Sequence, residues 1–240
     1  MKKNAKFKDI VDCKHCGLHD ICLPVSLSSA DLDLFDNIIK RKTIFEKNKI
    51  IYNYGDNFKS IYAIKSGSIK TIKTDAKNTQ IIGFYLPGEL LGLDAISSNR
   101  HSCSAIAIET TALCEIPFAA LDEMVIKIPG LGRQLIKIMS REKESDEIRM
   151  TILSHNSAKT RLARFLINLS NRFSNRSLSK KSFKISMSRI DTANYLGLAL
   201  ETVSRIFSTF KQDKIINIDN KIITILNGKQ LYKIGQITQQ

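Results

Sequence analysis

Long hydrophobic runs are missing from this sequence of 240 residues. None approaches the roughly 18 apolar residues that a membrane-spanning helix requires. The basic beginning, MKKNAKFKDIVDCKHC, has no apolar stretch behind it, which argues against a secretory signal. We therefore expect a cytoplasmic protein without a membrane partner.

Groupings of catalytic residues are missing as well. The four histidines are scattered, and there is no Ser/His/Asp grouping, no carboxylate pair and no phosphate-binding glycine loop. Apolar residues make up 43% of the chain and charged residues 25%, which is the balance of an ordinary folded domain. The composition therefore predicts a folded protein that is not an enzyme.

Acidic residues are scarce in the last 90 residues, where 15 Lys and Arg stand against four Asp and Glu, a net charge of +11. The first 150 residues hold 22 basic and 19 acidic residues, so they carry only +3 of the total of +14. A compact basic segment attracts phosphates and gains affinity when counterions are released. Double-stranded DNA is therefore the first partner to consider, because no Lys/Arg block typical of binding to anionic membranes is present.

Periodicity predicts an α+β protein. A helix opens near Ser28, and six short strand-like runs follow between residues 43 and 117, which indicates an antiparallel β-roll. The expected parts are a cysteine-rich arm (1–24), a β-roll sensor domain (25–129), a long dimerisation helix (130–154) and a winged helix-turn-helix domain (155–240).

The long helix carries two seams. Leu131, Leu135 and Ile138 are expected to pack on the β-roll. The second seam has the alternating three- and four-residue spacing of a coiled coil and consists of Ile136, Met139, Lys143, Asp146, Met150 and Leu153. Both seams could simply be buried in one chain. The polar residues in the middle of the second seam instead favour pairing with a second copy of the chain.

Residues 188–210 have the pattern of two helices joined at Gly197, where a positive φ would end the first helix. The expected core residues of the two helices are Ile190, Ala193, Tyr195, Leu196, Leu200, Val203, Ile206 and Phe210. Glu201, Ser204 and Arg205 share an exposed face near the start of the second helix, where they could contact base edges. The alternative is a solvated face with an internal Glu201–Arg205 pair. The basic setting and a predicted strand pair after the motif favour DNA binding.

Five cysteines remain. Cys13, Cys16 and Cys22 lie in the polar arm, and Cys114 lies at the end of a predicted strand. Cys103, in another predicted strand, is expected to be a core residue. Thiolates bind soft metals, so the arm is compatible with zinc, completed by His15 and His19, or with an iron–sulfur cubane held by four thiolates.

The Cys-x2-Cys-x5-Cys arm, the stretch LCEIPF and the stretch NYLGLALETVSR resemble the fumarate and nitrate reduction regulators of the CRP/FNR superfamily, over nearly the whole chain. The resemblance implies a cyclic-nucleotide-binding-like β-roll and a [4Fe-4S] cluster bound by Cys13, Cys16, Cys22 and Cys114, without Cys103. Oxygen would convert the cluster and dissociate an active dimer. Activation or repression of genes of anaerobic metabolism would follow, with RNA polymerase as the protein partner.

The resemblance further implies that Glu201, Ser204 and Arg205 read TTGAT-type half-sites. It also implies that Asp146 repels its own copy across the dimer axis and makes dimerisation conditional. Lys143 departs from the family pattern, which has an apolar residue there, and we expect it to neutralise Asp146 in part.

Two other functions are compatible with parts of the sequence. One is a regulator similar to the cyclic-AMP receptor, whose nucleotide pocket needs Gly-Glu-Leu and, later, an Arg followed by two small residues. Gly88-Glu89-Leu90 is present, but Arg100 is not directly followed by such a pair of small residues. The other is an electron-transfer iron–sulfur protein, which would leave the helix-turn-helix without a purpose.

Overall fold

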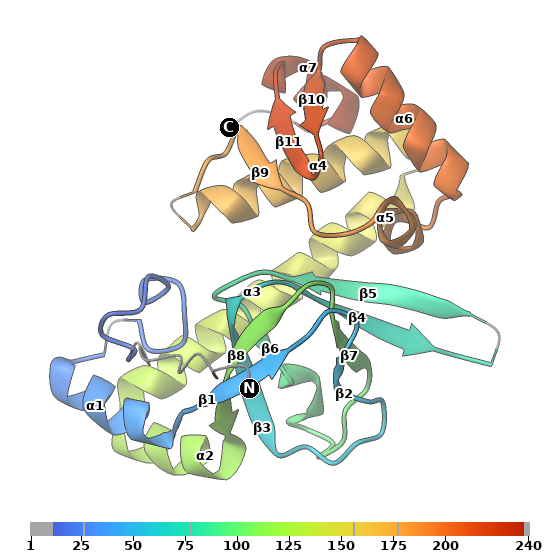
Figure 1. The fold of residues 1–240 in the computed structure, drawn as a ribbon. Coiled ribbons are helices and arrows are strands. Elements are labelled where there is room, and N and C mark those ends of the chain that lie inside the picture. The colour runs from blue at the N-terminus through green and yellow to red at the C-terminus, as the bar shows by residue number, and fades with distance from the viewer. Residues whose placement is uncertain (1–11, 26, 77, 156, 177, 238–240) are drawn as a thin grey trace, which may run out of the picture. The chain divides into compact units, whose positions relative to one another are not determined.

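The structure is a computed structural model that describes residues 12–25, 27–76, 78–155, 157–176 and 178–237. The first eleven residues of the predicted arm therefore lie outside the described residues. The chain forms two compact units, the first with residues 1–69 and 85–139 and the second with residues 70–84 and 140–240 (Figure 1). Within the described ranges, no helix is both long and apolar enough to cross a membrane.

A β-roll follows the first helix, as predicted. Helix α1 (Ser29–Ile38) is capped by Ser28, whose hydroxyl accepts a hydrogen bond from the backbone N–H of Asp31. The strands are β1 (Lys40–Phe45), β2 (Ile50–Tyr52), β3 (Ser60–Ser66), β4 (Ile69–Thr74), β5 (Thr79–Tyr85), β6 (Leu90–Leu91), β7 (Ser104–Ala107) and β8 (Thr111–Pro117). They form two four-stranded sheets, with the orders β1-β8-β3-β6 and β2-β7-β4-β5. Strands β1 and β6 were not predicted, since neither alternates between apolar and polar residues.

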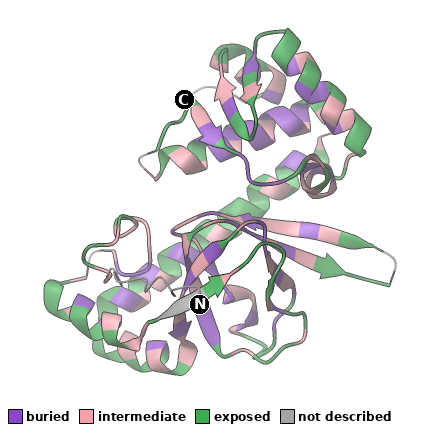
Figure 2. Ribbon diagram, viewed as in Figure 1, coloured by how far each residue is buried: buried purple, intermediate pink, exposed green. Residues whose placement is uncertain are grey.

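An apolar cluster helps to hold the first unit together. Figure 2 shows in purple the buried stretches of the chain. The buried members of this cluster are Leu23, Phe35, Ile61, Ala63, Leu90, Ile116, Leu121, Ile128, Leu131 and Ile138. They come from the arm, from α1, from the β-roll and from two further helices, α2 (Phe118–Lys127) and α3 (Pro129–Ser154). Leu131 and Ile138 are buried and Leu135 is partly buried against this cluster, which confirms the predicted inward seam.

The second unit contains the predicted helix-turn-helix and wing. Its elements are α4 (Ala158–Ser174), β9 (Ser182–Lys184), α5 (Arg189–Leu196), α6 (Leu200–Gln212), β10 (Ile216–Asp219), β11 (Ile222–Ile225) and α7 (Gly228–Gly235). Gly197 ends α5 with a φ of 61°, as expected. Strands β10 and β11 pair antiparallel, and β9 adds to β11. Helix α7, which has eight residues and begins and ends at a glycine, was missed, because glycine is a turn signal in sequence.

Two of the expected core residues are exposed. Ile190 is 66% exposed and Leu200 is 37% exposed. Helix α5 instead buries Thr192, Ala193 and Leu196, so Ile190 lies outside its inward arc. Helix α6 buries Val203, Ile206, Phe207 and Phe210, of which Phe207 was not predicted.

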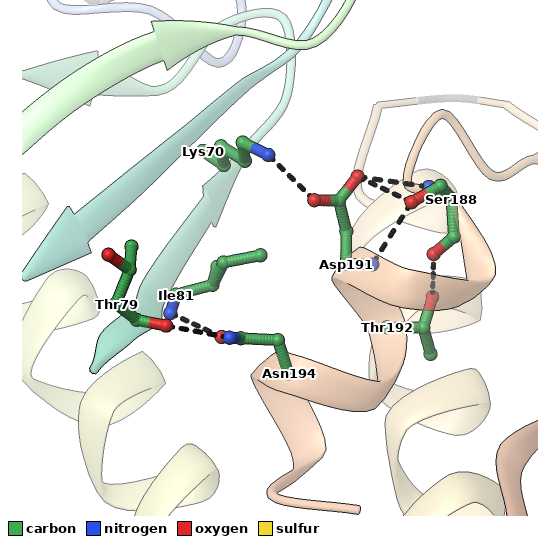
Figure 3. A network of polar contacts seen from close by, with 7 residues as sticks. All are labelled: Lys70, Thr79, Ile81, Ser188, Asp191, Thr192 and Asn194. Carbon is green, nitrogen blue, oxygen red and sulfur yellow. Dashed lines mark hydrogen bonds and ion pairs between the residues drawn. The ribbon is translucent and has the colours of Figure 1, made fainter. Parts of the chain in front are cut away.

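Helix α5 is fixed to residues 70–84 of the same unit by a polar network (Figure 3). The ammonium of Lys70 lies 2.6 Å from Oδ1 of Asp191. Oδ2 of Asp191 accepts hydrogen bonds from the backbone and the hydroxyl of Ser188, which caps the helix in return. Asp191 therefore caps α5 and anchors it at the same time.

Asn194 provides a second anchor, two residues before the end of α5 (Figure 3). Its Oδ1 accepts a hydrogen bond from the backbone N–H of Ile81 at 2.6 Å, and its Nδ2 donates to the carbonyl of Thr79 at 2.7 Å. Strand β5 is the last strand of its sheet, so its outer backbone groups need partners. The amide of Asn194 satisfies two of them.

Asp191 should make the stability of the second unit depend on pH. Burial alone would raise the pKa of Asp191, but hydrogen bonds from Lys70 and Ser188 outweigh burial and hold the pKa below its ordinary value. The folded state therefore keeps Asp191 ionised to lower pH than the unfolded chain does. Its contribution is present above the unfolded pKa and is lost as the pH falls through the folded pKa.

We expect Asp191→Asn to flatten the acid side of the stability profile. Urea unfolding followed by circular dichroism, from about pH 7 to about pH 3, measures this effect. Asp213→Asn, at the exposed end of α6, is the matched control and should follow the wild type. The prediction would be contradicted if acidification lowered the free energy of unfolding of Asp191→Asn as much as that of the wild type.

Candidate metal centre and nucleic-acid interface

Residues 12–25 form a series of turns that carry three of the cysteines. The backbone N–H of His19 donates to the carbonyl of Cys16 at 2.9 Å, and that of Cys22 donates to the carbonyl of Leu18 at 3.0 Å. Leu23 is fully buried in the apolar cluster. The backbone N–H of Cys13 donates to Oδ1 of Asp36 on α1 at 2.8 Å. This part of the arm is therefore held against the β-roll.

A cavity in the first unit brings the four predicted ligands together. Cys13, Cys16 and Cys22 come from the arm, and Cys114 comes from β8, where it pairs with Ala63 of β3. The other lining residues are Asp12, Leu18, His19, Pro24, Phe35, Ile39, Ala63, Ile64, Lys65 and Ile116. Cys103 is not among them. It is buried, its Sγ lies 3.6 Å from Asp94, and it precedes β7 rather than lying in a strand as predicted.

The environment of the thiols is largely apolar. Burial raises the pKa of Cys22 to about 12, against the lowering effect of a hydrogen bond from the backbone of Leu23. The thiols of Cys114, Cys13 and Cys16 raise it further, because each would be a like charge when ionised. Cys22 is thus a protonated thiol near neutral pH, and a bound metal would have to displace its proton.

The two histidines of the arm lie in different places. The side chain of His15 is 79% exposed and its Nδ1 lies 2.7 Å from Asp12, so His15 is not part of the cavity wall. His19 lies on the wall, and its Nε2 is buried without a hydrogen-bond partner in the described part of the chain. The position of His15 counts against a zinc site completed by both histidines.

Four thiols and one imidazole nitrogen are a donor set that fits an iron–sulfur cluster. Their side chains do not converge into a closed coordination sphere. Among the described residues, no three Cys, His, Asp or Glu form a group that could hold a metal ion. Binding therefore requires the thiols to come closer together than they lie here.

The residues weighed for a nucleotide site are engaged locally. Arg100 is exposed and donates from Nη1 to the carbonyl of Gly55 at 3.0 Å. Oε2 of Glu89 accepts a hydrogen bond from the backbone N–H of Leu86 at 2.8 Å. Arg100 is thus engaged at the turn of Gly55 and Glu89 within its own turn, which counts against a cyclic-nucleotide site.

Helix α6 presents the predicted base-reading face. Glu201 and Arg205 are exposed and Ser204 is half-buried, while the opposite side of the helix is buried. Glu201 and Arg205, both within the described residues, form no ion pair with each other. Their charged groups are therefore available to a partner, which counts against the solvated-pair alternative.

The second seam of α3 is exposed in the single chain except at Leu153, which is half-buried. Ile136 is 68% exposed, Met139 42% and Met150 64%, and Lys143 and Asp146 are also exposed. In the single chain Lys143 lies 3.7 Å from Glu147, one turn further on, so its expected neutralisation of Asp146 stays a prediction. Partial burial raises the pKa of Asp146, and Arg149 rather than Lys143 counteracts this shift.

Comparison with known proteins agrees with this architecture. The profile of the cyclic nucleotide-binding domain matches residues 42–127, and that of the Crp-like helix-turn-helix domain matches residues 160–234. The transcriptional activator protein Anr of Pseudomonas protegens is 46% identical over 220 residues, which are 91% of this chain and 90% of that protein. The fumarate and nitrate reduction regulatory protein of Escherichia coli K12 is 40% identical over 230 residues, 95% of this chain and 92% of that protein.

Among solved structures, FixK2 from Bradyrhizobium japonicum aligns with a TM-score of 0.74 at 26% identity, over 82% of this chain and 97% of that chain. The Pseudomonas and Escherichia relatives are by name a transcriptional activator and a regulatory protein, and the two profiles that match this chain cover its β-roll and its helix-turn-helix. The chain therefore belongs to the CRP/FNR family of DNA-binding transcription regulators and is not an enzyme.

Proposed function

We propose that this regulator is an oxygen-responsive switch that holds a [4Fe-4S] cluster on Cys13, Cys16, Cys22 and Cys114. The observation that carries the proposal is the cavity, which brings three arm cysteines and one strand cysteine to a single apolar wall. When bound, the cluster would supply a redox centre that oxygen can attack. The names of the relatives, which refer to fumarate and nitrate reduction, support an anaerobic role.

The apolar cluster of the first unit can carry the signal to α3. Cys13, Cys22 and Cys114 pack against the same cluster that contains Leu131 and Ile138 of α3. A change in the position of the arm therefore alters the packing beneath the first turns of that helix. We assign residues 1–24 to cluster binding, 25–129 to the sensor β-roll, 130–154 to dimerisation and 155–240 to DNA binding.

The active form would be a homodimer. Ile136, Met139 and Met150 leave an apolar seam uncovered on α3, at a spacing suited to a parallel partner helix. In that pairing Asp146 faces its own copy, and two carboxylates in a partly dry interface repel each other. Cluster-dependent packing of α3 would have to overcome this repulsion, which makes dimerisation conditional.

The dimer would place two copies of α6 on a dyad DNA site. Glu201, Ser204 and Arg205 would contact base edges of TTGAT-type half-sites in the major groove. The +11 charge of residues 151–240 would supply the attraction to phosphate. RNA polymerase would be the protein partner on the bound promoter.

Anaerobic purification tests the cluster. The wild type should be coloured, should contain about four iron and four sulfide per chain, and should bleach in air. Cys22→Ser should be colourless, because it removes one thiolate ligand. Cys103→Ser should stay coloured, because Cys103 lies outside the cavity. A colourless wild type with one zinc per chain would overturn the proposal.

Replacement of Asp146 tests the repulsion. In cluster-free protein, Asp146→Ala should lower the dimer dissociation constant by about tenfold, or about 1.4 kcal/mol, measured by sedimentation. Glu144→Ala, which removes an exposed carboxylate of the same helix outside the seam, is the control and should leave the constant unchanged. An Asp146→Ala variant as monomeric as the wild type would argue against a repulsive role.

Replacement of Arg205 tests base reading. Arg205→Ala should weaken binding to a specific site by about 1–3 kcal/mol and relax the preference at one base pair, as measured by fluorescence anisotropy on a panel of single-base variants. Lys211→Ala, in the last turn of α6, should leave the base preference intact. Equal base preferences in Arg205→Ala and the wild type would remove Arg205 from the reading face.

A further inference from the structure

His19 is a polar residue of the cavity wall that the proposed ligand set leaves without a role. Its backbone N–H donates to the carbonyl of Cys16, which fixes its place between the second and third cysteines of the arm. Its side chain is 28% exposed, and Nδ1 is the outer nitrogen, 3.4 Å from the exposed carboxylate of Asp20. Nε2 is fully buried and has no hydrogen-bond partner among the residues that the structure describes.

A buried nitrogen without a partner is unfavourable, so a hydrogen-bond partner is expected for Nε2. The polar residues beside it on the wall do not provide one. Oδ1 of Asp12 accepts from the backbone N–H of His15 at 2.9 Å and lies 2.7 Å from His15 Nδ1. Neither Lys65, also on the wall, nor any cysteine sulfur of the described chain lies within hydrogen-bond distance of Nε2. A partner therefore has to come with the group that the cysteines bind.

We propose that His19 is a positioning residue of the metal centre, whose Nε2–H donates a hydrogen bond to a sulfur atom of the cluster or of its cysteine ligands. This inference rests on the proposed function. An Nε2–H is present in the imidazolium and in the neutral tautomer that gives up the 3.4 Å contact between Nδ1 and Asp20. A hydrogen bond to sulfur withdraws negative charge from the centre, raises its reduction potential and opposes its oxidation.

The test uses the full chain, with the cluster assembled under anaerobic conditions, in four forms: wild type, His19→Ala, His19→Gln and His15→Ala. His15→Ala is the matched control, because it removes the same kind of side chain from the same arm at an exposed position outside the cavity. His19→Gln keeps an amide N–H at a similar distance from the backbone. The readouts are iron and sulfide content, the reduction potential from an anaerobic titration, and the rate at which the visible absorbance is lost in air-saturated buffer.

We expect all four proteins to contain the same amounts of iron and sulfide. His19→Ala should have a lower reduction potential than the wild type and should bleach severalfold faster, because the sulfur loses its hydrogen bond. His19→Gln should lie between His19→Ala and the wild type. His15→Ala should match the wild type in both measurements.

Two results would overturn the role of His19. One is a His19→Ala variant with the potential and bleaching rate of His15→Ala. The other is a His19→Ala variant that folds, as judged by circular dichroism, but takes up no iron, because His19 would then be a ligand. A wild type that binds zinc and no iron would instead overturn the proposed function, and this inference with it.

Discussion

Burial of the cysteine-bearing arm against the β-roll is the constraint on which the first unit depends. Leu23 enters the apolar cluster from the arm, and Phe35 enters it from α1. These contacts hold the arm beside β8, so that Cys114 joins cysteines about ninety residues away in sequence. The same cluster contains Leu131 and Ile138 of α3. The cysteine-lined cavity and the first turns of α3 therefore share one set of packing contacts.

In the second unit, polar contacts rather than an apolar cluster connect α5 to residues 70–84. Asp191 and Asn194 fix α5 to residues 70–84, and α5 packs against the helix that carries Arg205. Both anchoring residues also satisfy groups that would otherwise lack partners, the first turn of α5 and the free edge of β5. These charge-assisted and backbone hydrogen bonds thus help to hold the first helix of the helix-turn-helix against residues 70–84.

Sequence patterns predicted the elements with strong periodicity or clear turn signals. The β-roll, the long helix with its inward seam, the turn at Gly197 and the two wing strands agree with the structure. The failures have physical reasons. Strand β1 pairs with β8 without alternating apolar residues, and Ile190 lies outside the arc that α5 buries. The Ser188-x-x-Asp191 spacing was a capping signal that could have been recognised from sequence.

Local patterns in the sequence were enough to identify the main features of both ends of the chain. Three thiols in a Cys-x2-Cys-x5-Cys arm, a strongly basic C-terminal segment and an amphipathic helix pair are all properties of short stretches of residues. Only the tertiary structure decided which residues meet. It separated His19 on the cavity wall from His15 in solvent, directed Lys143 to Glu147, and joined Lys70 to Asp191 across 121 residues. Such pairings depend on side-chain direction and long-range packing, which the order of residues along the chain does not reveal.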